Sequence, residues 1–215
     1  MPLVAIVRHG QASFGSADYD ALSAVGEEQS SLVGVELRRR GLREPEVVAG
    51  TLRRQRHTAS LLMAAAGYPG PCGTDKRWDE FDHLALLSRY VDPARVEPTR
   101  QDSRAFQRLL DEALEGWTRD GGWAAFTADA LAALQDVAEA APKGRDAVVV
   151  SSGGVIGALA AGLLGAPAAT GIALNRVAVN GAITLVAVGG RGAHLLTFND
   201  HAHFTGPRRE LLTYR

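Results

Sequence analysis

Residues 3–15 read LVAIVRHGQASFG, a hydrophobic run that stops on an arginine and a histidine. A short apolar run of this kind is typical of a buried β-strand, and such a strand would bring Arg8 and His9 to one edge of a sheet. Gly10 follows at once, and a residue without a Cβ lets the backbone turn close to a ligand. The stretch therefore predicts an α/β sheet with a ligand site at the end of its first strand.

The overall composition indicates a well-buried globular protein without a charge bias. The 215 residues are 46% hydrophobic, and 23 basic residues against 24 acidic ones leave a formal net charge of -1. We therefore expect neither nucleic acid nor a membrane as a partner. The single cysteine, Cys72, excludes an intrachain disulfide, and the N-terminus lacks a signal-peptide pattern, so we expect a cytoplasmic protein.

Strand and helix patterns alternate along the chain. The order is a strand at 3–8, a helix at 23–40 between Ser23 and Gly41, a strand at 46–50, a helix at 54–66, helices near 102–116 and 124–141, a strand at 146–150, a helix at about 154–164, and a hairpin of strands at 182–188 and 193–198. This order predicts an α/β fold, a three-layer α/β/α sandwich with a mostly parallel mixed sheet. We expect a single domain over residues 1–215, with an insertion or lid at about 68–123 over one sheet edge.

Three predicted strands end in polar or glycine-rich segments. These are VRHG at 7–10, AGTLRR at 49–54 and VSSGG at 150–154. Ligands of parallel α/β sheets bind at the carboxyl ends of the strands, so we expect the three segments to converge in space.

Six short motifs occur in order along nearly the whole chain. They are VRHGQASF (7–14), LSAVGEEQ (22–29), GTLRRQRHTA (50–59), RWDEFD (77–82), WAAF (123–126) and FNDHAHF (198–204). Together they resemble the histidine phosphatase superfamily, the phosphoglycerate mutase-like proteins. The family patterns are Arg-His-Gly, Leu-Thr/Ser-x-x-Gly-x-x-Gln, Ser-x-Leu-x-Arg-Ala-x-x-Thr-Ala, Arg-Leu-x-Glu, Trp-x-x-Phe and Asn-Asp-x-x-His-Leu. Each motif is weak alone, but their order makes the resemblance strong.

The resemblance implies catalysis through a phosphohistidine. His9 would attack as a neutral imidazole, while Arg8 and Arg54 would clamp the doubly charged phosphate with forked donors. Two nearby guanidinium groups also lower the pKa of an imidazole, which keeps the nucleophile unprotonated. No metal or organic cofactor is expected, because the arginines supply the charge neutralisation that a metal would otherwise provide.

Glu80 falls where the family keeps the acid that protonates the leaving oxygen. Asp79 and Asp82 flank it, so the acid could be one of these neighbours instead. Gln11 could donate a hydrogen bond to the anion or cap the loop, and the residues leave both roles open.

Ser152 marks a departure from the family pattern. The resemblance places a second, cationic histidine of an SHGG motif at this position, where a serine carries no charge. A charge-assisted hydrogen bond is worth about 1.5 to 3 kcal/mol against about 1 for a neutral one, so we expect an active but slower enzyme that Ser152→His would accelerate. Backbone N–H groups at a helix start beginning with Gly153 could compensate, as could His57 or His83.

Other readings of the sequence are less favoured. The run GGVIGALAAG lacks the spacing of a dinucleotide-binding loop, and Ser152 lacks the preceding glycine of a serine hydrolase elbow. His201 and His203 could hold a metal if the DHAH segment is extended, although the resemblance makes a structural role of His203 more plausible.

The favoured function is hydrolysis of a small phosphate monoester. A phosphoglycerate mutase-type phosphomutase and a weakly active or non-catalytic binder of phosphorylated ligands stay open, as does pairing into a homodimer. The leaving group is unspecified, because the insertion could present either aromatic or basic side chains to it, such as Phe81, His83, Arg89, Tyr90 and Arg100.

Overall fold

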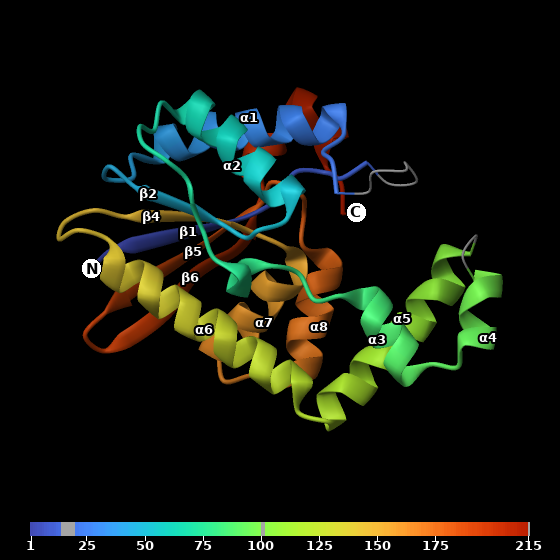
Figure 1. Ribbon diagram of the computed structural model, residues 1–215. Helices are drawn as coiled ribbons and strands as arrows, with labels where there is room; N and C mark the ends of the chain where they lie inside the picture. Colours follow the sequence, from blue (N-terminus) through green and yellow to red (C-terminus); the bar gives the residue numbers. More distant parts are fainter. Residues whose placement is uncertain (14–19, 100–101, 215) are drawn as a thin grey trace.

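The computed structural model of the protein describes residues 1–13, 20–99 and 102–214, which leaves Arg100 outside the described residues. A six-stranded sheet in the order β3-β2-β4-β1-β5-β6 lies at its centre (Figure 1). Strands β1 (Leu3–Arg8), β2 (Glu46–Ala49), β3 (Gly73–Thr74) and β4 (Ala147–Ser151) are parallel. Strand β5 (Ile183–Gly189) pairs antiparallel with both β1 and β6 (Gly192–Asp200), so the sheet is mixed as predicted.

Helices cover both faces of the sheet, which confirms the three-layer α/β/α sandwich (Figure 1). One face carries α1 (Ala24–Arg40) and α2 (Arg53–Ala66). The other carries α6 (Gly122–Ala140) and α7 (Gly153–Leu163), with α8 (Ala168–Val177) packed beside α7. The remaining helices are α3 (His83–Tyr90), α4 (Pro93–Val96), α5 (Ser103–Arg119) and the short 3-10 turns Lys76–Trp78, Glu97–Thr99, Ala202–Phe204 and Gly206–Leu211.

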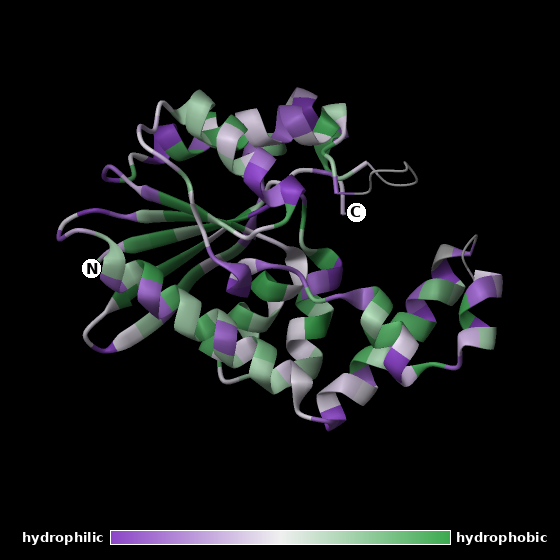
Figure 2. Ribbon diagram, viewed as in Figure 1, coloured by the Kyte–Doolittle hydropathy of each residue, from purple (hydrophilic) through white to green (hydrophobic). Residues whose placement is uncertain are grey.

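The first strand shows why both faces need a cover. Side chains alternate along a strand, so Ala5 and Val7 enter the core under α1 and α2, while Val4 and Ile6 enter the core under α6 and α7. Figure 2 shows the result as hydrophobic strands enclosed by helices with mixed faces. A central strand buried on both sides reads as a continuous apolar run, which is the pattern that opens the chain.

The predicted helix ends are confirmed at both helices of the first layer. Ser23 caps α1 by accepting a hydrogen bond from the Gly26 N–H at 3.1 Å. Gly41 and Gly67 end α1 and α2 in the left-handed region, with φ of 66° and 72°, where a glycine is favoured.

The segment 68–123 differs from the prediction. It adds the short strand β3 to the sheet edge, and then α3, α4 and α5 pack together away from the strands instead of over that edge (Figure 1). The helices at 83–96 were not predicted, because prolines and short lengths hide their periodicity. Asp82 starts α3 by accepting from the N–H groups of Leu84 and Ala85, both at 3.0 Å.

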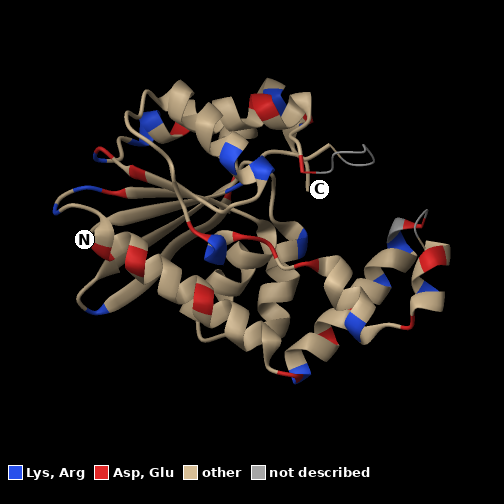
Figure 3. Ribbon diagram, in the orientation of Figure 1, with Lys and Arg blue, Asp and Glu red and all other residues tan. Residues whose placement is uncertain are grey.

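Charge and hydropathy agree with the composition. Basic and acidic residues are interspersed over the helices (Figure 3). Within the described residues, no helix has both the length and the apolar character required to cross a bilayer.

Candidate active site

The site forms where β1 and β4 end side by side. These strands pair in register up to Arg8 and Ser151, and the His9 N–H donates to the Ser151 carbonyl oxygen at 2.9 Å. The His9 carbonyl oxygen accepts from Asn180 Nδ2 at 3.1 Å. The two strand ends therefore bring VRHG and VSSGG together, as the parallel sheet predicted.

Gly10 is needed for a reason that differs from our prediction. A Cβ at this position would lie 2.3 Å from the Gly26 carbonyl oxygen and 2.8 Å from Ser30 Oγ. The close neighbour is thus the backbone of α1, and the glycine lets the loop after β1 cross that helix.

Hydrogen bonds to both ring nitrogens define the tautomer of His9. Arg54 Nε lies 3.1 Å from His9 Nε2, and a guanidinium can only donate, so Nε2 accepts. His9 Nδ1 lies 2.7 Å from the Gly10 carbonyl oxygen and therefore carries the proton. Burial holds the pKa of His9 well below its ordinary value of 6.5, and the charges of Arg54 and Arg8 lower it further. The imidazole is neutral, with a lone pair on Nε2.

An ion pair anchors Arg54, which lies in the first turn of α2. Its Nη1 is 2.6 Å from Asp20 Oδ1, and Asp20 Oδ2 accepts from the Arg53 N–H at 2.7 Å. Asp20 therefore holds the guanidinium while its Nε faces His9. This carboxylate has no counterpart in the motifs that predicted the site.

Arg8 is held from the other side by backbone carbonyls. Its Nη1 donates to Ala178 O, and to Tyr214 O at 3.0 Å. A Cβ at Gly153 would lie 2.5 Å from Asn175 Oδ1, so glycine leaves room for the Asn175 side chain of α8, while Arg8 Nε, at 3.5 Å, would be at ordinary contact distance.

Glu80 is the carboxylate that reaches this centre. Its Oε2 accepts from the Gly154 N–H at 2.9 Å, and its Oε1 accepts from the Phe81 N–H at 3.1 Å. Burial raises the pKa of Glu80 above its ordinary value of 4.5, although the two N–H groups and the charges of Arg8 and Arg54 oppose the increase. A Cβ at Gly154 would lie 2.1 Å from Glu80 Oε1, so this position must also be glycine.

The two neighbouring carboxylates have structural roles. Asp79 binds the Thr51 N–H at 2.5 Å and the Thr51 hydroxyl at 2.6 Å, which fixes the loop before α2. Asp82 caps α3. The ring of Phe81 lies 5.7 Å from Trp117 and 5.9 Å from Phe126, between ring centroids, and this aromatic packing orients the segment that carries Glu80.

These residues match a known family. The sequence model of the "Histidine phosphatase superfamily (branch 1)" matches residues 4–201. The chain belongs to the histidine phosphatase superfamily.

Relatives of known sequence are named as mutases. The chain is 30% identical over 177 residues to "Probable phosphoglycerate mutase GpmB" of Citrobacter koseri, covering 77% of this chain and 76% of the relative. It is 26% identical over 174 residues to a protein of the same name from Escherichia coli, with the same coverage.

Solved structures with this fold include phosphatases and a mutase. Mycobacterial glucosyl-3-phosphoglycerate phosphatase superimposes with a TM-score of 0.66 at 21% identity, covering 94% of this chain and 100% of that one. A putative alpha-ribazole-5'-P phosphatase from Escherichia coli gives 0.62 at 20% identity, covering 93% and 98%. A phosphoglycerate mutase from Bacillus anthracis gives 0.67 at 16% identity, covering 94% of each chain.

Ser152, which the sequence comparison of motifs aligns with a histidine, is fully buried. Its Oγ accepts a hydrogen bond from Gln55 Nε2 at 2.9 Å, and the same Nε2 donates to the Trp78 carbonyl oxygen at 2.8 Å. Gln55 Oε1 accepts from the Leu52 N–H at 3.3 Å. Gln55 thus ties together the three segments that carry Arg54, Glu80 and Ser152.

Gln55 has no role in the motifs that predicted the site. It replaces the alanine that follows the arginine in the family pattern, and it is as fully buried as Ser152. The difference from the family pattern at Gln55 is visible in the sequence. Only the fold shows that Gln55 contacts Ser152, where the sequence also differs from the pattern.

Gln11 bonds to the loop and α1. Its N–H donates to Gln29 Oε1 at 2.8 Å, and its Oε1 accepts from Ser23 Oγ at 2.8 Å. This is the loop-capping arrangement, and a contact of its amide nitrogen with phosphate stays a prediction.

Two further histidines, His83 and His203, pack against aromatic side chains. His83 is half-buried against Phe106, with ring centroids 6.4 Å apart. Burial lowers its pKa, Asp82 opposes this decrease, and the charge of Arg54 adds to it. His203 packs on Phe204 and lies 3.1 Å from the Gly181 carbonyl oxygen through Nε2. Over residues 1–13, 20–99 and 102–214, no cluster of three or more histidine, cysteine or acidic side chains has the arrangement of a metal site.

Proposed function

We propose that the protein is a phosphatase that hydrolyses a small phosphate monoester through a phosphohistidine on His9. The observation that carries the proposal is the state of the imidazole. His9 Nδ1 faces the Gly10 carbonyl oxygen at 2.7 Å, while Nε2 faces the clamp with its lone pair. A neutral imidazole held in one tautomer beside two guanidinium groups is suited to attack a phosphorus atom.

In the first step, the substrate phosphate replaces His9 Nε2 as the acceptor of the Arg54 Nε hydrogen bond, and the freed Nε2 lone pair forms a bond to phosphorus as the ester P–O bond breaks. Arg8 and Arg54 stabilise the charge on the transferring phosphoryl oxygens. Glu80, whose pKa burial raises above its ordinary value, acts as the acid and gives a proton to the leaving oxygen, which departs as an alcohol.

In the second step, a water molecule attacks the phosphohistidine. The Glu80 carboxylate takes a proton from that water as its oxygen bonds to phosphorus and the N–P bond breaks. Inorganic phosphate leaves, His9 is neutral again, and Glu80 is again protonated.

The proposal is tested by phosphate release from a panel of phosphate monoesters between about pH 5 and 8. The variant His9→Ala should abolish release, and His194→Ala, which changes an exposed histidine on the edge strand β6, should not. Release that is unaffected in His9→Ala would refute the role of His9.

A phosphomutase is the second candidate, because the named sequence relatives are probable phosphoglycerate mutases. A mutase accumulates a stable phosphoenzyme from a bisphosphate donor, whereas a phosphatase turns over. Tight binding of phosphorylated ligands with neither behaviour would identify a non-catalytic binder.

A further inference from the structure

A cavity of about 270 Å³ lies next to Arg8, between α5, α8 and the C-terminal segment. It is lined by Arg8, Gln107, Leu110, Leu114, Ile172, Asn175, Arg176 and Tyr214. Asn175 also lies close to the proposed phosphate clamp. A Cβ built on Gly153 would lie 2.5 Å from Asn175 Oδ1 and 3.5 Å from Arg8 Nε. The cavity and the proposed clamp therefore share Arg8.

The walls of the cavity differ in chemistry. Leu110 and Leu114 are one turn apart on α5 and share a face, and Ile172 lines the cavity from α8, so three aliphatic side chains form one apolar wall. Gln107 and Arg176 supply hydrogen-bond donors at the same cavity.

The guanidinium of Arg176 is held in place by α5. Its Nη2 lies 2.6 Å from Asp111 Oδ1, and Gln107 Nε2 donates to the same oxygen at 2.9 Å. An arginine has more N–H donors than one such contact uses, and its planar fork matches a carboxylate. Asp111 thus orients Arg176 at the cavity while leaving it able to take a second anion.

We propose that this cavity receives the leaving group of the monoester, and that the preferred leaving group is a small carbon-rich one ending in a carboxylate. This inference rests on the proposed hydrolysis. A volume of about 270 Å³ is roughly nine times the share of one water molecule in the liquid, which is enough for one ring with a substituent. The aliphatic wall would pack on the carbon body, and Arg176 would bind the carboxylate.

The test compares 4-carboxyphenyl phosphate with phenyl phosphate, which differ only in the carboxylate. In the wild type, kcat/KM should be higher for the carboxylated ester. Arg176→Gln should lower kcat/KM for that ester about tenfold through KM and leave phenyl phosphate nearly unchanged. Leu110→Ala should raise KM for both esters and keep their ratio.

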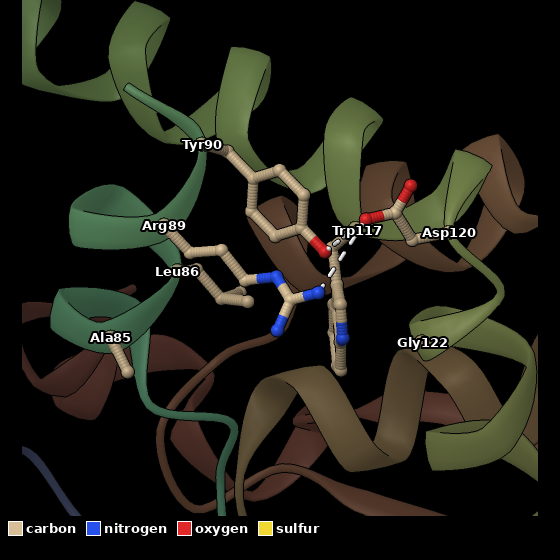
Figure 4. Close-up of a pocket in the computed structure, with 7 residues that line it drawn as sticks. All are labelled: Ala85, Leu86, Arg89, Tyr90, Trp117, Asp120 and Gly122. Carbon is tan, nitrogen blue, oxygen red and sulfur yellow. Dashed lines mark hydrogen bonds and ion pairs between the residues drawn. The ribbon is translucent and has the colours of Figure 1, made fainter. Parts of the chain in front are cut away.

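Arg89→Gln is the matched control. Arg89 lines a different cavity with Tyr90, Trp117 and Asp120, shown in Figure 4, and pairs with Asp120 at 3.8 Å. It should leave both esters unaffected. Equal losses for both esters in Arg176→Gln, or no loss for either, would overturn the assignment of the leaving-group pocket.

Binding separates this inference from the proposed hydrolysis. Calorimetry on His9→Ala measures both esters without turnover. Tighter binding of 4-carboxyphenyl phosphate that disappears on adding Arg176→Gln supports the pocket even if the wild type releases no phosphate. Equal affinities for the two esters would reject the pocket even if hydrolysis is demonstrated.

Discussion

The buried pair of Gln55 and Ser152 predicts how a histidine introduced at position 152 would be accommodated. Both side chains are 0% exposed, and Gln55 Nε2 lies 2.9 Å from Ser152 Oγ. An imidazole at 152 would need space that the Gln55 amide fills. We therefore expect Ser152→His alone to be overpacked, at a cost of about 1–3 kcal/mol, and Ser152→His combined with Gln55→Ala to regain part of that stability.

The expected magnitudes follow from the interactions exchanged. In a chain of 215 residues, each kcal/mol lowers the Tm by about 2–4 °C, so Ser152→His should melt roughly 2–12 °C below the wild type. Replacing a neutral hydrogen bond by a charge-assisted one gains about 0.5–2 kcal/mol in the transition state, which is roughly 2- to 30-fold in rate. The double variant should therefore exceed Gln55→Ala in kcat.

The assay is a double-mutant cycle of four proteins, with Tm by calorimetry and kcat on the best ester of the panel. A single Ser152→His variant that is both as stable as the wild type and faster would show that Gln55 does not occupy the histidine's space. A double variant no faster than Gln55→Ala would show that a second cation is not what limits turnover.

Three further predictions concern the other groups of the site. The acid limb of the kcat/KM profile should lie well below pH 6.5, because burial lowers the pKa of His9, and the alkaline limb should lie above pH 4.5, because burial raises the pKa of Glu80; Glu80→Gln should remove the alkaline limb. A persistent alkaline limb in that variant would assign it to another group. Asp20→Ala should raise KM about tenfold by releasing Arg54, whereas Asp20→Asn, which keeps an acceptor for the guanidinium, should raise KM less. A KM for Asp20→Ala equal to that of the wild type in steady-state kinetics would contradict the anchoring role. Gly154→Ala should lower kcat at least tenfold with an unchanged phosphate Kd, since its Cβ would displace Glu80; kcat within a factor of two of the wild type would argue against Glu80 as the acid.

Local patterns were enough to predict the layers of the fold and the residues that meet at its centre. A strand buried on both faces has to read as an apolar run, and Ser23 and Gly41 mark helix ends through contacts within a few residues. Arg8 is the last residue of β1 and His9 follows it directly, so both lie at the carboxyl end of a central strand. Helix α8 and strand β3 were not predicted from the sequence. The apolar residues of α8 are only weakly gathered on one face of the helix, and β3 has only two residues.

Only the tertiary structure decided which side chains support these residues. Gln55 meets Ser152 across 97 positions of sequence, Asp20 meets Arg54 across 34, and Arg8 reaches the Tyr214 carbonyl across 206. Such pairs leave no periodic trace, because each depends on where two separate elements come together in the packed chain. The sequence therefore determined the fold class and the placement of Arg8 and His9 at the end of the first strand, while packing determined which groups hold Arg8 and Arg54 and where the cavity beside Arg8 lies.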